Sequence, residues 1–140
     1  MKKIIYVLQF RGRASSEGDI LTASSCTFTT KLGPDGVNGS FAESDDDIAT
    51  FESRVIRTGE KSFVESGTIC FGKSCHKLRF STLGQGYLER SVQPELKHGS
   101  VIFRVDGGEG EFANATGMIT SNFTESDTGG WSTIRWQFSL

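Results

Sequence analysis

The stretch Gly107-Gly108-Glu109-Gly110-Glu111-Phe112-Ala113-Asn114-Ala115-Thr116-Gly117 decides how the chain is organised. Each of its glycines would cost a helix about 1 kcal/mol relative to alanine. The flanking residues, 101–105 and 118–123, are rich in β-branched and aromatic side chains, which favour strands. Glycine between strands indicates positive φ, a bulge or close backbone approach. We therefore expect a strand, a glycine corner, and a second strand over 112–123.

The rest of the sequence favours a single all-β domain spanning residues 1–140. Phenylalanine (11) and glycine (17) are abundant, and proline (2) is sparse. Short alternating runs are separated by polar or glycine-rich turns, and the 36–47 segment reads as a polar loop with an acidic cluster at 45–47. This spacing fits an up-and-down barrel or a sandwich. The strands are expected at 3–13, 21–31, 51–57, 62–70, 75–83, 87–92, 100–106, 112–123 and 131–140.

Between residues 107 and 117 the chain reads Gly-Gly-x-Gly-x-Phe-x-x-Ala-x-Gly. This pattern resembles the glycine corner of the allene oxide cyclase and dirigent families. The resemblance implies an eight-stranded, antiparallel, calycin-like β-barrel around a ligand cavity. Because those barrels often assemble, and because Val64 and either Trp131 or Trp136 should face outward, we expect a homo-oligomer, a dimer or a trimer. The alternative to such a barrel is that the glycine corner is a glycine-bulged hairpin in an unrelated sandwich.

Charge and hydropathy exclude several classes of partner. The net charge is −2, so no basic face for nucleic acid or an acidic membrane surface is indicated. No apolar run approaches the roughly 20 residues of a membrane span. The apolar run at 4–8 is shorter than the roughly 7–15 residues of a secretory core. We therefore expect a cytoplasmic protein, and no cofactor is indicated; a small-molecule partner is what the resemblance implies.

The cysteines are Cys26, Cys70 and Cys75. An odd count without an export signal favours reduced thiols. Cys70 and Cys75 bracket a turn, so a cross-strand disulfide is the alternative. The cysteines and the two histidines lack paired ligand spacing, and no metal site is predicted.

The hairpin over 63–82 gives the clearest prediction of which side chains point inward. A loop at 71–74 would pair Cys70 with Cys75, Ile69 with His76, and Glu65 with Phe80. One face of this hairpin is much more apolar than the other, so it should be the buried face, with both cysteines pointing away. The inward residues are then Phe63, Glu65, Gly67, Ile69, His76, Leu78, Phe80 and Thr82.

Glu65 and His76 are the polar members of that face. They would lie roughly 13 Å apart along the strands, too far for a catalytic dyad. An even-length loop between the preceding strands would place Arg54 opposite Glu65, whereas a one-residue bulge would turn Arg54 outward. A Glu65–Arg54 pair could serve only to close the barrel, or Glu65 could have its pKa tuned for proton transfer. His76 is either part of this polar set or a rim histidine bonded to a backbone carbonyl.

The candidate ligand-binding residues are mostly apolar and aromatic. Tyr87 could supply a phenolic donor, or it could pack in the core. Arg135 becomes a pocket residue only if its face of the last strand points inward. The candidates are Phe63, Ile69, Leu78, Phe80, Tyr87 and Arg135.

The sequence has no serine elbow, zinc-binding helix motif or phosphate loop, so a function can be predicted only from the architecture. Three functions fit this architecture. The resemblance implies a cyclase or isomerase for a small, largely apolar molecule, with Glu65, Arg54 and His76 as its catalytic candidates. The second function is a non-catalytic barrel that binds or templates a small hydrophobic ligand. The third is a packed scaffold or stress protein. A cavity of a few hundred cubic ångströms would separate the third from the others.

Overall fold

The computed structural model describes residues 5–8, 10–15, 17, 19–25, 28–33, 36–41, 49–72, 74–128 and 130–139. These residues form strands joined by turns and one short 3-10 helix, so the protein is all-β, as predicted. The strands are β1 (Ile5–Leu8), β2 (Phe10–Ala14), β3 (Ile20–Ser25), β4 (Phe28–Gly33), β5 (Gly36–Phe41), β6 (Ala49–Arg57), β7 (Ser62–Phe71), β8 (His76–Thr82), β9 (Gly86–Arg90), β10 (Leu96–Gly108), β11 (Met118–Ser126) and β12 (Gly130–Ser139), with the 3-10 helix η2 (Gly110–Phe112) before β11.

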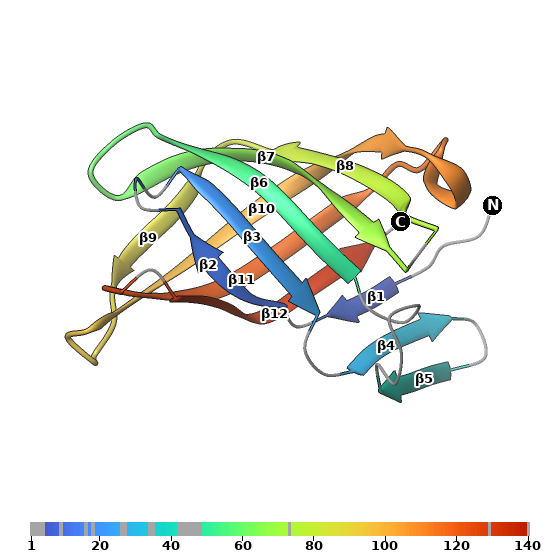
Figure 1. The fold of residues 1–140 in the computed structure, drawn as a ribbon, viewed down its shortest axis with the longest axis horizontal. Helices are drawn as coiled ribbons and strands as arrows, with labels where there is room; N and C mark the ends of the chain where they lie inside the picture. The colour runs from blue at the N-terminus through green and yellow to red at the C-terminus, as the bar shows by residue number, and fades with distance from the viewer. Residues whose placement is uncertain are drawn as a thin grey trace.

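The strands pair into one antiparallel sheet, which Figure 1 shows as long, strongly twisted ribbons. Ladders connect β2, β3, β6, β7, β8, β10, β11 and β12 in that order. β12 pairs with β11 on one side and with β1 and β2 on the other. The first strand, β1, is therefore paired with the last, β12. β4 pairs with β1, β5 pairs with β4, and β9 pairs with β10 and β7.

One face of the sheet is buried, as the alternation in the sequence predicts. In β6 the side chains at 49, 51 and 53 are buried and those at 50, 52 and 54 are exposed; in β10 Val101, Phe103 and Val105 are buried. Phenylalanine rings fill this face by edge and tilted contacts, which aromatic pairs prefer. Their ring centroids lie 5.0 Å apart for Phe10–Phe51, 4.6 Å for Phe80–Phe103 and 5.9 Å for Phe63–Phe123.

Four predictions about the strands need correction. The single strand expected at 3–13 is two strands, β1 and β2, which pair with different parts of β12. The segment 21–31 is not one strand, because β3 pairs with β2 and β6 whereas β4 pairs with β1 and β5. The polar loop expected at 36–47 begins with a strand, β5, and the acidic cluster at 45–47 lies outside the described residues. The strand after the glycine corner begins at Met118, not at Phe112, because the chain first makes the 3-10 helix η2.

The glycine corner docks its backbone against β8. Gly107 and Gly110 have φ of 84° and 65°, in the left-handed region that glycine adopts without strain. A Cβ on Gly108 would collide with the carbonyl oxygen of Lys77, and the Glu109 N–H donates to that oxygen at 2.7 Å. Close approach of two backbones thus explains the glycine at 108.

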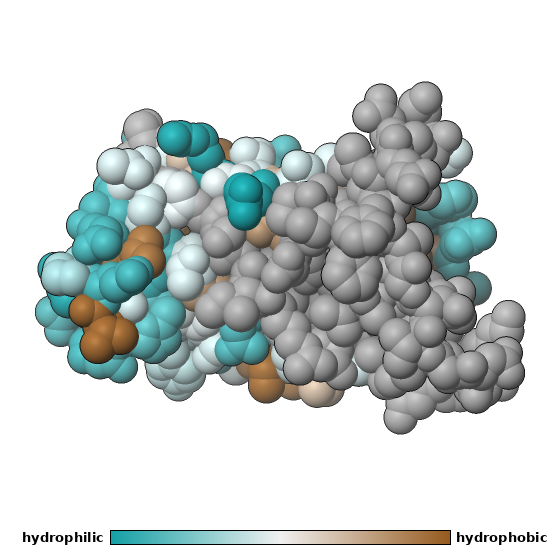
Figure 2. Space-filling model, turned by 90° about the horizontal axis from the view of Figure 1, so that it is seen from below, coloured by the Kyte–Doolittle hydropathy of each residue, from teal (hydrophilic) through white to brown (hydrophobic). Residues whose placement is uncertain are grey.

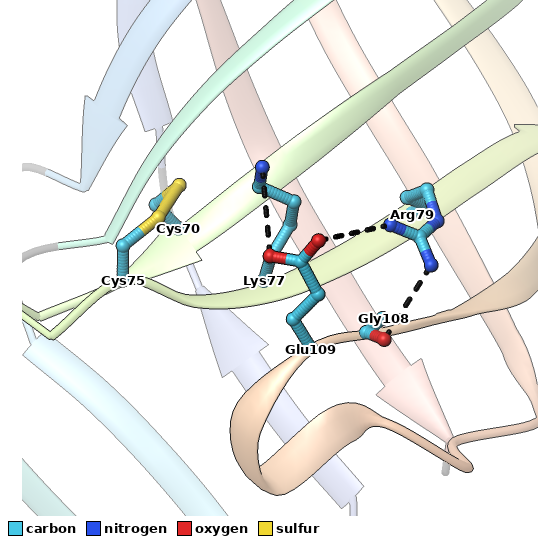
Figure 3. Close-up of polar contacts among 6 residues, drawn as sticks. All are labelled: Cys70, Cys75, Lys77, Arg79, Gly108 and Glu109. Atoms are coloured by element: carbon cyan, nitrogen blue, oxygen red, sulfur yellow. Dashed lines mark hydrogen bonds and ion pairs between the residues drawn. A yellow bond between two sulfur atoms is a disulfide. The ribbon is translucent and has the colours of Figure 1, made fainter.

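Glu109 also ties the corner to the outward side chains of β8, as Figure 3 shows. Its carboxylate lies 3.8 Å from Lys77 Nζ and 3.7 Å from Arg79 Nη1, and Arg79 donates to the Gly108 carbonyl at 3.4 Å. These groups are partly exposed to solvent, so the ion pairs contribute little stability.

The β7–β8 hairpin has the predicted faces but a different register. Ile69 lies opposite Leu78 and Phe71 opposite His76, two residues away from the predicted pairs. A shift of two residues leaves every side chain on its own face. The expectation of reduced thiols is wrong here, because Cys70 and Cys75 form a disulfide across the turn, as drawn in Figure 3.

The described surface is mainly hydrophilic, with hydrophobic residues scattered among polar ones on the face in Figure 2. No helix in the described part of the chain is long and apolar enough to cross a membrane. The exposed large apolar side chains are Ile56, Leu83, Tyr87, Val92, Ile102 and Met118.

Candidate functional site

A cavity of about 250 Å³ opens at the end of the sheet where β6 turns into β7, the left end of Figure 1. Its walls come from strands far apart in the sequence, namely β3, β6, β7, β9 and β11. Phe63 and Phe123 form one side through their ring contact. The cavity is therefore lined by the same buried face that forms the core. The apolar wall residues are Leu21, Val55, Phe63, Leu88 and Phe123.

Glycines leave the space that the two rings occupy. A Cβ on Gly86 would collide with the ring of Phe63, and a Cβ on Gly99 would lie 2.5 Å from the ring of Phe123. Gly86, in β9, pairs with Phe63 of β7, and Gly99, in β10, pairs with Leu88 of β9 and with Phe123 of β11. The aromatic wall thus depends on two positions that lack a side chain.

Glu65 is the polar group of this cavity, and it is only 5% exposed. Burial among apolar side chains raises the pKa of its carboxyl to about 7, because the charged form loses its hydration, while a hydrogen bond from Ser53 opposes the rise. Ser53 Oγ donates to Oε2 of Glu65. Near neutral pH, the Glu65 carboxyl therefore exists in both protonation states.

The backbone of Glu65 is fixed by a threonine. Thr82 Oγ1 accepts a hydrogen bond from the Glu65 N–H at 2.7 Å and donates to the Glu65 carbonyl at 2.8 Å. The backbone ladder between β7 and β8 reaches only Ser66 and Ser81. The threonine hydroxyl therefore continues the pairing of the two strands past the last backbone pair and holds Glu65 in position.

Charged side chains surround the mouth of the cavity. Glu17, Asp19 and Glu125 contribute carboxylates, and Arg57 contributes a guanidinium. Asp19 and Glu125 are half-buried, while Glu17 and Arg57 are exposed. Asp19 Oδ1 accepts from Ser15 Oγ at 2.9 Å, and the Asp19 carbonyl accepts from the Val55 N–H at 2.7 Å. The rim is thus mainly acidic, and Asp19 is held in place by both its side chain and its backbone.

The predicted Glu65–Arg54 pair is absent. Val55 lies opposite Glu65, and Arg54 pairs with Ser66 on the exposed side of the sheet. The loop between the paired residues Arg57 and Phe63 has an odd number of residues, and this turns Arg54 outward. Glu65 has no ion pair with any described residue.

His76 lies at the opposite end of the sheet from Glu65, beside the glycine corner. Its Nδ1 accepts a hydrogen bond from the Glu111 N–H at 3.3 Å, and its ring fills the space beside Gly110. Of the two alternatives for His76, its place at the end of the hairpin agrees with the rim histidine, but its hydrogen-bond partner is a backbone N–H and not a carbonyl. It does not line the cavity that contains Glu65.

The predicted ligand-binding residues separate into four groups. Phe63 lines the cavity. Ile69, Leu78 and Phe80 are almost completely buried in the core and lie outside the cavity lining. Tyr87 is 60% exposed, because it alternates outward on β9, so its assignment to the interior is wrong. The side chain of Arg135 lies outside the described residues.

Two buried serines, Ser53 and Ser121, were not predicted from the sequence. Ser53 is 3% exposed, and Gly67, its partner on β7, leaves room for it. Ser121 is 2% exposed, lies one inward position deeper on β11 than Phe123, and its Oγ has no hydrogen-bond partner among the described residues. The alternation of β6 and β11 would have found both, because each takes the place of an apolar residue on the buried face.

A second depression shares Arg57 and Leu88 with this cavity. It encloses about 590 Å³, but its other lining residues are charged or are histidine, and Lys61 and Glu89 pair with each other across it at 2.9 Å. Both partners of this pair are largely exposed. The smaller cavity is the better candidate site, because specific small-molecule sites combine apolar walls with a few placed polar groups.

Comparison of the chain with protein-family models, with curated proteins and with solved structures gave no match.

Proposed function

We propose that the sheet closes into a calycin-like barrel and that its end cavity takes up a small, largely apolar molecule, on which the protein acts as an isomerase or cyclase. The support for closure is that β12 pairs both with β11 and with β2, the two ends of the remaining strand order. The resemblance of the glycine corner to allene oxide cyclase and dirigent barrels points the same way.

The observation that carries the proposal is Glu65 at the cavity wall. A carboxyl whose pKa is about 7 can both accept and return a proton at neutral pH, which is what general acid–base catalysis needs. In such an isomerisation the Glu65 carboxylate takes a proton from carbon, and the released electron pair moves into a conjugated system. The new Glu65 O–H then returns the proton at another atom, so Glu65 is regenerated and no co-reactant is consumed.

A non-catalytic binding function is the second candidate, and a specific observation favours it. Arg54 points outward and His76 lies at the other end, so Glu65 acts without the other two residues predicted for catalysis. A carrier needs only the apolar walls and one polar group to orient its ligand.

Isomerisation of a β,γ-unsaturated cyclic ketone in D₂O tests the proposal, with binding followed by NMR of the same sample. The wild type should bind the ketone, convert it to the conjugated isomer and introduce solvent deuterium. Glu65→Gln should bind it without conversion. Binding without conversion by both proteins, across a panel of unsaturated ketones and epoxides, would favour the carrier. Absence of binding across that panel would contradict both candidates.

A further inference from the structure

The rim of the cavity differs from its walls in charge. Of its described charged side chains at the mouth, three are acidic (Glu17, Asp19 and Glu125) and one is basic (Arg57). None of these four takes part in an ion pair between described residues. The described side chains at the mouth therefore carry a net negative charge beside an apolar wall.

Glu65 adds a buried polar group that faces the same space. It is 5% exposed and lines the cavity, and among the described residues only Ser53 donates to it, through Oε2. Its Oε1 receives no hydrogen bond from a described residue. A hydrogen-bond donor on a ligand would therefore not have to displace a described side chain from this oxygen.

A metal ion does not suit this arrangement. No three His, Cys, Asp or Glu side chains in the described part of the chain are grouped so that they could hold one. The rim carboxylates are spread around an opening whose inner walls are apolar, namely Leu21, Val55, Phe63, Leu88 and Phe123. Separate carboxylates above an apolar chamber match an organic cation, whose charge and apolar body need different surroundings.

We propose that the ligand of this cavity is an apolar molecule that carries a protonated amine. The ammonium group lies at the rim, where Asp19, Glu125 and Glu17 accept its hydrogen bonds. The apolar body lies between the Phe63 and Phe123 rings and the aliphatic wall, and the far end of the molecule reaches Glu65. This inference rests on the proposed function, since it names the class of molecule that the same cavity takes up.

The size and the anchoring of the site agree with this ligand. A cavity of about 250 Å³ suits a ligand of roughly one ring with a short substituent. Asp19 is the best placed rim acceptor, because the Ser15 hydroxyl and the Val55 N–H already fix its side chain and its backbone. A fixed carboxylate loses little side-chain entropy when it binds a cation.

The test compares benzylamine with benzyl alcohol and phenylacetate, which share a ring and differ in charge. Affinities are measured by NMR titration at pH 7.5 and low salt, where we expect benzylamine to bind at least tenfold more tightly than benzyl alcohol and phenylacetate to bind least. The preference for the amine should fall with added salt, because the rim is partly open to solvent. The double variant Asp19→Asn, Glu125→Gln should reduce the preference to less than threefold and leave the affinity for benzyl alcohol unchanged.

Glu52→Gln is the matched control, since Glu52 lies on the exposed side of β6 and its replacement removes one negative charge away from the cavity. The Glu52→Gln variant should keep the full preference for benzylamine over benzyl alcohol. Equal binding of amine and alcohol to the wild type would overturn the amine inference and leave the proposed apolar site intact. Failure of all three compounds to bind would overturn both. Loss of benzyl alcohol binding in the double variant would also overturn the inference, because the rim would then be structural.

Discussion

Ser53 reaches Glu65 diagonally across the β6–β7 ladder. Val55, not Ser53, is the residue opposite Glu65, while Ser53 lies opposite Gly67, whose missing side chain leaves it room. The hydroxyl donates to Oε2 of the carboxylate and so favours the charged form that burial disfavours. The protonation of Glu65 near neutral pH is set by the competition between these two effects.

Glu65→Gln should change how stability depends on pH. The ordinary pKa of the carboxyl is 4.5, and in the folded protein it is about 7. Between these values the folded protein holds a proton that the unfolded chain has released, so Glu65 costs no stability below pH 4.5 and destabilises increasingly as pH rises to about 7. The gap corresponds to about 3 kcal/mol. Chemical denaturation at pH 4, 6 and 8 should show this loss in the wild type and not in Glu65→Gln.

Glu52→Gln controls for the change of net charge and should keep the pH dependence of the wild type. If Glu65→Gln were less stable than the wild type at pH 8 by several kcal/mol, Glu65 would have a cationic partner after all. That is the result expected from the Glu65–Arg54 pair, which the register of β6 and β7 excludes.

Ser53→Ala should raise the pKa of Glu65 still further from its ordinary value, because the hydrogen bond that favours the carboxylate is lost. At pH 8 the variant should also lose about 1 kcal/mol of stability. Carbon NMR of labelled glutamate carboxyl groups reports the titration directly. Ser66→Ala, on the exposed side of β7, is the control and should leave the Glu65 titration where it is. A lower pKa in Ser53→Ala would contradict the geometry.

The sequence predicted which face of the β7–β8 hairpin is buried, but not its register. A four-residue loop at 71–74 and one at 72–75 give the same alternation, so hydrophobic pattern cannot separate them. The structure uses the second loop, with Gly72 and Cys75 at φ of 71° and 50°. Turn geometry, which local pattern encodes weakly, decides between the two.

Loop parity also explains why Arg54 was misplaced and the cavity was only partly predicted. An even or an odd loop between β6 and β7 fits the sequence equally well, and only the odd one turns Arg54 away from Glu65. The rim residues Asp19 and Glu125 come from segments more than a hundred residues apart along the printed sequence. No local pattern brings them together, because their neighbourhood depends on the pairing of strands that are distant in the sequence.

The disulfide makes a simple count of thiols informative. The sequence has three cysteines, and two of them, Cys70 and Cys75, are joined in a disulfide. Protein denatured without reductant should therefore react with one equivalent of thiol reagent, and with three after reduction. Because the bond closes a small loop, replacing both cysteines by serine should cost about 2 kcal/mol. Three reactive thiols before reduction would contradict the bond.

A homo-oligomer remains a prediction from the resemblance, and it can be measured directly. Among the described residues, β5 pairs only with β4, so its other edge offers unpaired backbone groups to a second copy. Light scattering at micromolar concentration should give two or three times the 15.3 kDa of one chain. A mass near 15 kDa would end this prediction.

Gly108→Ala should destabilise the glycine corner by about 3 kcal/mol, at the upper end for an overpacked site. The added Cβ would meet the Lys77 carbonyl oxygen, which belongs to a paired strand and cannot rotate away. The collision would also break the hydrogen bond from the Glu109 N–H to that oxygen. Gly130→Ala is the matched control, since its Cβ would meet only the movable hydroxyl of Ser126 at 3.0 Å. In urea denaturation, the midpoint of unfolding of Gly108→Ala should be well below that of Gly130→Ala. Equal midpoints would mean that the backbone of the corner is not in close contact with β8.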